Sequence, residues 1–138
     1  MEILNTHYKE WLPKIEFVHA KILRKDDTGE IQPMDVAFIE GAISSNSQEE
    51  KLKRIREKAD KLITIGSCAT TGSPSNQRNF FQGKKLEEIE PILQKFKYKE
   101  KVLKVSDVVT VNMSINGCPM NETQFIQCME NLLAEKHA

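Results

Sequence analysis

Two cysteines that follow glycines at the ends of apolar segments are the residues of this chain best suited to chemistry. Cys68 comes two residues after Gly66, and Cys118 comes directly after Gly117. Glycine lets a bulky inorganic group approach the backbone, and cysteine thiolates are the usual protein ligands of iron–sulfur clusters. A cubane cluster usually takes four protein ligands, so the pair predicts part of a metal or cluster site.

The spacing of these cysteines does not define a metal site by itself. Cys68 and Cys118 lie far apart in the sequence, and neither belongs to a Cys-x-x-Cys pair. Free cysteines are often simply buried, but a packing cysteine does not need a glycine before it at the end of a strand. Position therefore favours ligation for these two. Cys128 falls among apolar residues of a predicted helix, and we expect it to pack there.

Glu40 ends a third apolar segment, immediately before Gly41. Two interpretations stay open: a proton carrier or interface carboxylate beside the cluster, or a carboxylate that only ends a strand and binds a nearby amide or arginine. Arg78 lies in a polar loop, where a solvated arginine is more usual than an ion pair with a partner or cofactor. Surface or packing roles are also expected for the three histidines, His7, His19 and His137.

Length and composition limit the class of protein. With 138 residues the chain has the size of one domain, and its 20 basic and 20 acidic side chains give no electrostatic case for nucleic acid. The sequence has no apolar run long enough for a membrane span, and its start does not resemble a signal peptide. Three thinly spread cysteines without an export signal favour free thiols or metal ligands in the cytoplasm.

The elements that position these residues alternate between strand and helix. Short apolar runs predict strands, and apolar residues at helical spacing predict helices. The predicted strands cover residues 15–23, 35–39, 62–65 and parts of 102–115. The predicted helices cover residues 5–13, a segment from the cap residues 44–47 to about residue 60, residues 86–96, and a final helix after Asn121.

This alternation favours an α/β fold with a mainly parallel sheet. Ligands bind beyond the carboxyl ends of the strands in such sheets, so Glu40, Cys68 and Cys118 are expected to meet at one edge. Residues 70–83 are rich in Gly, Ser, Asn and Gln and predict an irregular loop that serves a partner or a cofactor.

Three segments together resemble a known family. Residues 36–41, 63–69 and 116–119, in this order and at these separations, resemble the small subunit of nickel-iron hydrogenases. The resemblance covers residues 34–133. The loop containing residues 76–79 is similar to that of the soluble, cytoplasmic, cofactor-reducing branch, which is related to the 20 kDa subunit of respiratory complex I.

The resemblance implies a flavodoxin-like three-layer sandwich that holds the proximal 4Fe-4S cluster beside a large subunit carrying the nickel-iron centre. Cys68 and Cys118 correspond to two of the four cluster ligands. Gly66 and Gly117 form the turns around the cluster, where backbone amides are expected to donate to its sulfurs, and Glu40 lies near the same site. The function implied is that of an electron-transfer small subunit in a hydrogenase-type oxidoreductase, together with the large subunit and further electron-transfer subunits.

The chain also departs from the family pattern. The other two ligands of the family come from a Cys-x-x-Cys motif after a first strand, and this sequence has neither. We therefore expect residues 1–138 to form a single, N-terminally incomplete domain, with the missing ligands supplied by another chain or segment. Ser73 and Met120 stand where the family usually has glycine and proline. The alternatives are a scaffold or assembly subunit without a cluster, and a small flavodoxin-like binding protein.

Overall fold

The computed structural model describes residues 2–18 and 30–137. The chain divides into two compact units, which are described separately. One contains residues 33–120, and the other contains residues 1–32 together with residues 121–138. The expectation of one domain over residues 1–138 stays a prediction.

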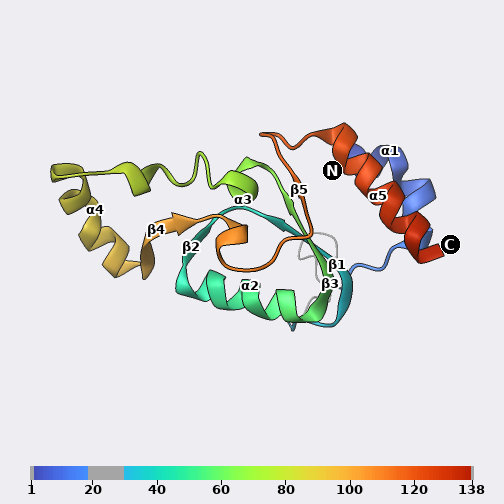
Figure 1. The fold of residues 1–138 in the computed structure, drawn as a ribbon, viewed down its shortest axis with the longest axis horizontal. Helices are drawn as coiled ribbons and strands as arrows, with labels where there is room; N and C mark the ends of the chain where they lie inside the picture. The colour runs from blue at the N-terminus through green and yellow to red at the C-terminus, as the bar shows by residue number, and fades with distance from the viewer. Residues whose placement is uncertain (1, 19–29, 138) are drawn as a thin grey trace. The chain divides into compact units, whose positions relative to one another are not determined.

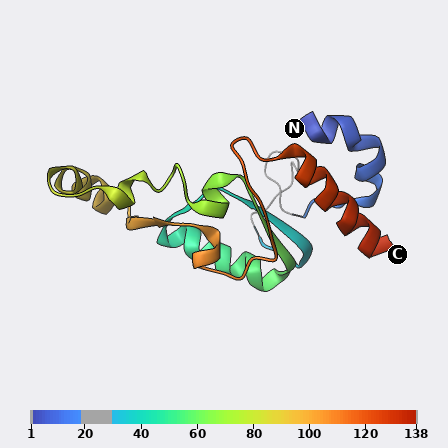
Figure 2. The ribbon, with the colours of Figure 1, turned by 45° about the horizontal axis from the view of Figure 1, so that its top comes forward.

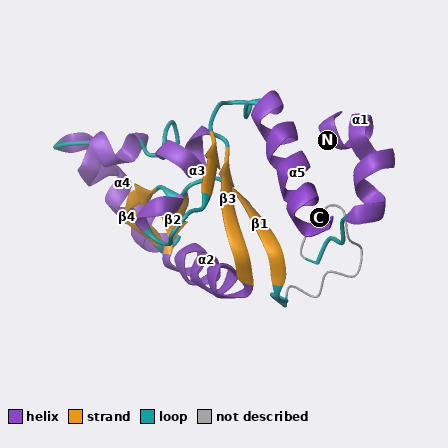
Figure 3. Ribbon diagram, turned by 45° about the vertical axis from the view of Figure 1, so that its right-hand side comes forward, coloured by secondary structure: helices purple, strands orange, loops and turns teal. Residues whose placement is uncertain are grey.

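A parallel sheet forms the centre of the unit containing residues 33–120. All its pairings are parallel, and β3 lies between its two neighbours, where Leu62, Ile63 and Thr64 are almost completely buried. Figure 3 shows the strands side by side. The α/β class with a mainly parallel sheet is thereby confirmed. The strands are β1 (Met34–Glu40), β3 (Ala59–Ile65) and β5 (Met113–Ile115).

The helix α2 (Asn46–Lys58) connects the first two strands of this sheet and packs beside them (Figure 1). Ser45 caps it, because its hydroxyl accepts a hydrogen bond of 3.3 Å from the amide of Gln48. The predicted helix was two residues too long. Ala59 starts β3 because it is already in register with Met34 of β1.

The core of this unit lies where α2, β3 and the loops around them meet. Its members are apolar side chains that are at least nine-tenths buried. Burial of each large aliphatic side chain contributes about 1.5–3 kcal/mol to the free energy of unfolding. The central members are Ile43, Leu52, Leu62, Ala69 and Val105. Leu52 comes from the apolar stripe that predicts this helix, so the stripe does face the core.

A second sheet has two antiparallel strands, β2 (Ile43–Ser45) and β4 (Tyr98–Leu103). The predicted strand character of residues 102–115 is thus divided between two sheets. The chain turns after β4 through the 3-10 helix η3 (Val105–Asp107), and the carboxylate of Asp107 accepts from the amide of Lys104 at 3.3 Å. This turn ends one strand, so the apolar run cannot continue as a single strand.

Glu49 ties α2 to the second sheet. Its carboxylate pairs with Lys53 on the same helix and with Lys99 on β4. The hydrogen bonds from these two lysines lower the pKa of Glu49 to about 2.

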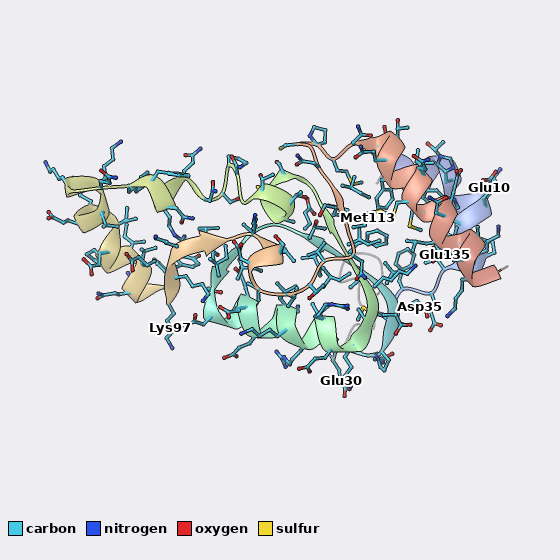
Figure 4. The ribbon with its side chains drawn as sticks, in the orientation of Figure 1. Glu10, Glu30, Asp35, Lys97, Met113 and Glu135 are labelled. Carbon is cyan, nitrogen blue, oxygen red and sulfur yellow. The ribbon has the colours of Figure 1, made fainter. Side chains whose placement is uncertain are left out.

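The helix α4 (Lys84–Lys95) lies next to β4 and away from the parallel strands (Figures 1 and 2). Leu93 is buried, whereas Ile92 and Phe96 are exposed. The chain reverses at Lys97, labelled in Figure 4, which has a φ of 55° in the left-handed region that glycine usually occupies after a helix.

The segment 70–83 is more ordered than the irregular loop that its composition predicts. It begins inside the short helix α3 (Ser67–Thr71) and contains the 3-10 helix η2 (Gln77–Phe80). Asn79 donates to the carbonyl of Val102 and accepts from its amide, both at 2.7 Å. Two main-chain contacts from one side chain therefore hold this segment against β4.

Arg78 strengthens the same attachment. Its Nη2 donates to the carbonyl oxygens of Ser44 at 3.1 Å and Lys99 at 2.7 Å, and its guanidinium lies 5.7 Å from the ring centre of Tyr98. The interpretation of Arg78 as a solvated loop arginine is therefore wrong. The physical reason is that β2 and β4 present backbone carbonyls that only tertiary folding brings beside it.

The other unit contains α1 (Glu2–Trp11), the 3-10 helix η1 (Leu12–Lys14) and α5 (Glu122–His137). Asn121 caps α5 as predicted, since its Oδ1 accepts from the amide of Gln124 at 3.0 Å. The Trp11 ring is buried between His7, with ring centres 4.7 Å apart, and Phe125, at 6.5 Å. These contacts confirm a packing role for His7.

Two further expectations concern this unit. Cys128 is buried in α5, as expected for a packing residue. The strand predicted for residues 15–23 is wrong over residues 15–18, which form no strand, while residues 19–23, with His19, lie outside the described residues. His137 is the last residue of α5. Of the helices in residues 2–18 and 30–137, none combines the length and apolar character that crossing a bilayer requires.

Replacing Asn79 by alanine is expected to lower the free energy of unfolding by about 1–3 kcal/mol, because the amide and carbonyl of Val102 both lose their partner. Urea unfolding followed by circular dichroism measures this change. Gln77→Ala, in the same 3-10 helix and exposed, serves as the control and should change stability little. Equal midpoints for the two variants would contradict the anchoring role of Asn79.

Candidate functional site

The carboxyl ends of the three parallel strands lie at one edge of the sheet. Glu40 is in register with Ile65, and Ile65 is in register with Ile115. Each strand therefore ends at the same level, and the segments that follow β3 and β5 are those that carry Cys68 and Cys118. The sheet brings together the three segments that the sequence predicts to meet.

Two backbone hydrogen bonds join the loops that carry the cysteines. The amide of Gly66 donates to the carbonyl of Ile115 at 2.8 Å, and the amide of Ser67 donates to the carbonyl of Gly117 at 2.9 Å. Each cysteine directly follows one of the residues so joined. Cys68 is half-buried, Cys118 is exposed, and both are free thiols, so a ligand can reach this edge from solvent.

Both glycines are favoured by the conformation of the backbone. Gly66 has φ 84° and ψ 158°, and Gly117 has φ 115°, which are conformations that residues with a Cβ rarely adopt. A Cβ placed on Gly66 would lie 3.7 Å from the carbonyl oxygen of Gly117, an ordinary contact. The backbone of the turn thus gives one reason for glycine, and the close approach of a bulky group, for which the sequence indicates glycine, stays a prediction.

Hydroxyl groups lie beneath these loops and connect them. Thr64, which is 1% exposed, donates to the hydroxyl of Ser114 at 2.9 Å, linking β3 to β5. Thr70 donates to the carbonyl of Gly66 at 2.8 Å, and its hydroxyl lies 3.5 Å from that of Thr64. Sequence reasoning missed these residues. The available signal is a polar residue, Thr64, in the middle of the apolar run that forms β3.

Ser75 is a further residue that sequence reasoning missed. Its hydroxyl donates to the Sγ of Cys68 at 3.1 Å. No spacing rule predicts this contact, because it depends on how the chain turns after α3.

Glu40 is exposed at the end of β1, next to Gly41 with φ 85°. Among the described residues its side chain has no hydrogen-bond or ion-pair partner. The interpretation that Glu40 binds a nearby amide or arginine therefore has no support in this part of the chain. A role at the site stays a prediction.

The thiols fit an iron–sulfur cluster in kind but not in number. Within residues 2–18 and 30–137 there is no group of three or more His, Cys, Asp and Glu side chains that could hold a metal ion. Cys68 and Cys118 have the donor chemistry of cluster ligands, and their loops are hydrogen-bonded neighbours at an accessible edge. They correspond to half of a four-ligand set.

The backbone amides of the glycine turns donate to acceptors within the protein and not toward a bound cluster. Those of Gly66 and Ser67 donate to the carbonyls of Ile115 and Gly117, and that of Gly117 donates to the side chain of Asn116 at 2.8 Å. We expect such amides to donate to cluster sulfurs, but in the structure those of Gly66 and Ser67 join the two loops and that of Gly117 binds its neighbour Asn116.

The sequence profile of the family described as NADH ubiquinone oxidoreductase, 20 Kd subunit, matches residues 1–132. A subunit of the vhu F420-non-reducing hydrogenase of Methanocaldococcus jannaschii is 30% identical over 140 residues, which cover 86% of this chain and 46% of the relative. The delta subunit of sulfhydrogenase 2 of Pyrococcus furiosus is 30% identical over 101 residues, covering 71% of this chain and 41% of the relative. The chain thus spans less than half the length of these curated relatives.

A solved structure shares the fold. A chain in the crystal structure of an NAD+-reducing [NiFe]-hydrogenase in the H2-reduced state matches with a TM-score of 0.81 and 20% identity. The match covers 98% of this chain and 83% of that chain.

Replacing Gly66 by alanine is expected to lower the free energy of unfolding by about 1–3 kcal/mol, because alanine is strained at φ 84° and ψ 158°. The matched control is Ser67→Ala, the next residue, which lies in α3. Urea denaturation of both variants beside the unmodified chain measures the difference. If Gly66→Ala were as stable as the control, the turn would not require glycine.

Proposed function

Because the chain belongs to the family of the 20 Kd subunit of NADH ubiquinone oxidoreductase, we propose that it is the electron-transfer small subunit of a nickel-iron hydrogenase-type oxidoreductase. The observation that carries this proposal is the pair of backbone hydrogen bonds that brings the Cys68 and Cys118 loops together at one sheet edge. The names of the relatives as hydrogenase subunits support it. Conversion of hydrogen belongs to the large partner subunit, which carries the nickel-iron centre.

In this proposal Cys68 and Cys118 are two of the four ligands of a proximal 4Fe-4S cluster. The other two thiolates come from a second chain or segment with a Cys-x-x-Cys motif. The edge that carries Glu40 and both cysteines faces the large subunit, and further electron-transfer subunits continue the path. The complex works in the cytoplasm.

The residues of this chain have separate tasks at the site. The thiolates hold the cluster, which when bound accepts and releases electrons one at a time. The turns at Gly66 and Gly117 set the positions of the thiolates, and the hydroxyl of Thr64 keeps β3 and β5 together below them. Ligands that are fixed in this way do not have to rearrange when the charge of the cluster changes.

A second candidate function is that of a scaffold or assembly subunit that retains the fold without a cluster. The observation in its favour is the number of ligands, because the described residues offer only two thiols at this edge. The two candidates differ in iron content and can be separated directly.

The chain is to be produced with its genomic neighbours and purified without oxygen, and iron and sulfide are then measured. Cys68→Ser and Cys118→Ser should each remove about four iron atoms per complex, because serine is a poor substitute for a cluster thiolate. Cys128→Ala, which removes the buried thiol of α5, should leave the iron content unchanged. Iron content unaffected by both serine variants would contradict ligation, and a complex without iron would favour the scaffold function.

A further inference from the structure

We propose that Ser75 is a positioning residue that raises the reduction potential of the cluster by donating its hydroxyl hydrogen bond to the Cys68 sulfur. The inference rests on the proposed function, since it assumes that Cys68 is a cluster ligand. It assigns a specific task to a segment whose composition alone indicates only a functional loop.

The contact itself is a side-chain hydrogen bond to sulfur. The Oγ of Ser75 lies 3.1 Å from the Sγ of Cys68 and is the donor. A cysteine that binds iron does so as the thiolate, which is a better acceptor than the thiol. The bond therefore strengthens when Cys68 becomes a ligand.

The backbone between the two residues holds Ser75 in place. The amide of Gly72 donates to the carbonyl of Cys68 at 3.0 Å, and the amide of Asn76 donates to the carbonyl of Gly72 at 2.8 Å. These consecutive bonds turn the chain back on itself, so that Ser75 returns to the residue where the turn began. The position of the Ser75 hydroxyl is therefore set by a hydrogen-bonded turn.

Gly72 lies at the point where the chain reverses direction in this turn. It is buried and has a φ of 85°, and a Cβ at this position would lie 3.2 Å from the Nδ2 of Asn76. The backbone conformation therefore favours glycine, and a Cβ would require the side chain of Asn76 to shift. The turn after α3 is thereby fixed in one shape.

The amides of the two glycine turns already have acceptors. The amides of Gly66, Ser67 and Gly117 donate to protein acceptors, as described above. Arg78, the cation of the same segment, directs its Nη2 to two carbonyls of the second sheet. Within the described residues, the hydroxyl of Ser75 is the side-chain donor that is hydrogen-bonded to a thiol of this pair.

The sign of the effect follows from charge. One-electron reduction adds one negative charge to the cluster and its thiolates, so a donor that points at a ligand sulfur stabilises the reduced state more than the oxidised state. Hydrogen bonds to the sulfurs are one of the factors that set the potentials of iron–sulfur clusters. Loss of the Ser75 hydroxyl therefore makes reduction harder.

The test compares Ser75→Ala with the unmodified chain in the anaerobically purified complex. Dithionite supplies the electrons in a potentiometric titration, and the reduced cluster is followed by electron paramagnetic resonance. At a fixed ambient potential near the midpoint, the ratio of reduced to oxidised cluster should fall about threefold to tenfold, the effect of losing one ordinary hydrogen bond. For a one-electron couple a tenfold fall is a shift of about 59 mV to lower potential.

Two controls separate the hydroxyl from the turn. Ser75→Thr retains a hydroxyl and should restore the original potential, and Ser73→Ala removes an exposed serine from the same segment and should not change it. An unchanged potential in Ser75→Ala, with iron retained, overturns the role of Ser75 and leaves the proposed function standing. A complex without iron before any substitution overturns both.

A measurement on the unmodified complex covers the case in which Ser75→Ala loses its cluster. In electron-nuclear double resonance of the reduced cluster, a hydroxyl proton hydrogen-bonded to a ligand sulfur gives a coupling that disappears after exchange into deuterium oxide. The coupling should be present in the unmodified complex and in Ser75→Thr. Its absence from the unmodified complex overturns the proposal.

Discussion

The two backbone hydrogen bonds between the segments after β3 and β5 are the interaction on which the rest of the site depends. They join Gly66 to Ile115 and Ser67 to Gly117. Without them the thiols of Cys68 and Cys118 would sit on two independent loops, and ordering both loops around a shared ligand would cost conformational entropy. With these bonds, the two loops are already ordered when the protein has folded. The amides of Gly66 and Ser67 donate in these bonds, and the amide of Gly117 donates to the side chain of Asn116, which explains why these amides are not free for a ligand.

These bonds extend the pairing of the parallel sheet beyond the strands. The amides of Gly66 and Ser67 continue the ladder in which Ile65 already pairs with Ile115. The hydroxyl bond between the buried Thr64 and the exposed Ser114 adds a side-chain link at the preceding position. A buried hydroxyl such as that of Thr64 is stable only when it has a partner, so this link also disfavours a shifted register of β5.

The segment after α3 is also held by polar groups, which bind the backbone of distant strands. Arg78 and Asn79 bind backbone atoms of β2 and β4, which fixes one end of the segment, and Gly72 fixes the other end through its turn. Ser75 lies between these fixed points. A hydroxyl on a free loop would exchange its partner for water, whereas this one is held at 3.1 Å from the Cys68 sulfur.

The sequence by itself determined the features that depend on near neighbours: a helix cap within residues 44–47, the cap at Asn121, the strands at residues 35–39 and 62–65, the α/β class, and the family. Only the tertiary structure decided which strand pairs with which. It split the apolar run 102–115 between two sheets, directed Arg78 to carbonyls more than twenty residues away along the chain, and placed Ser75 beside Cys68. The reason is physical: caps and periodicity act within one or two turns of chain, while these contacts exist only after distant segments have packed.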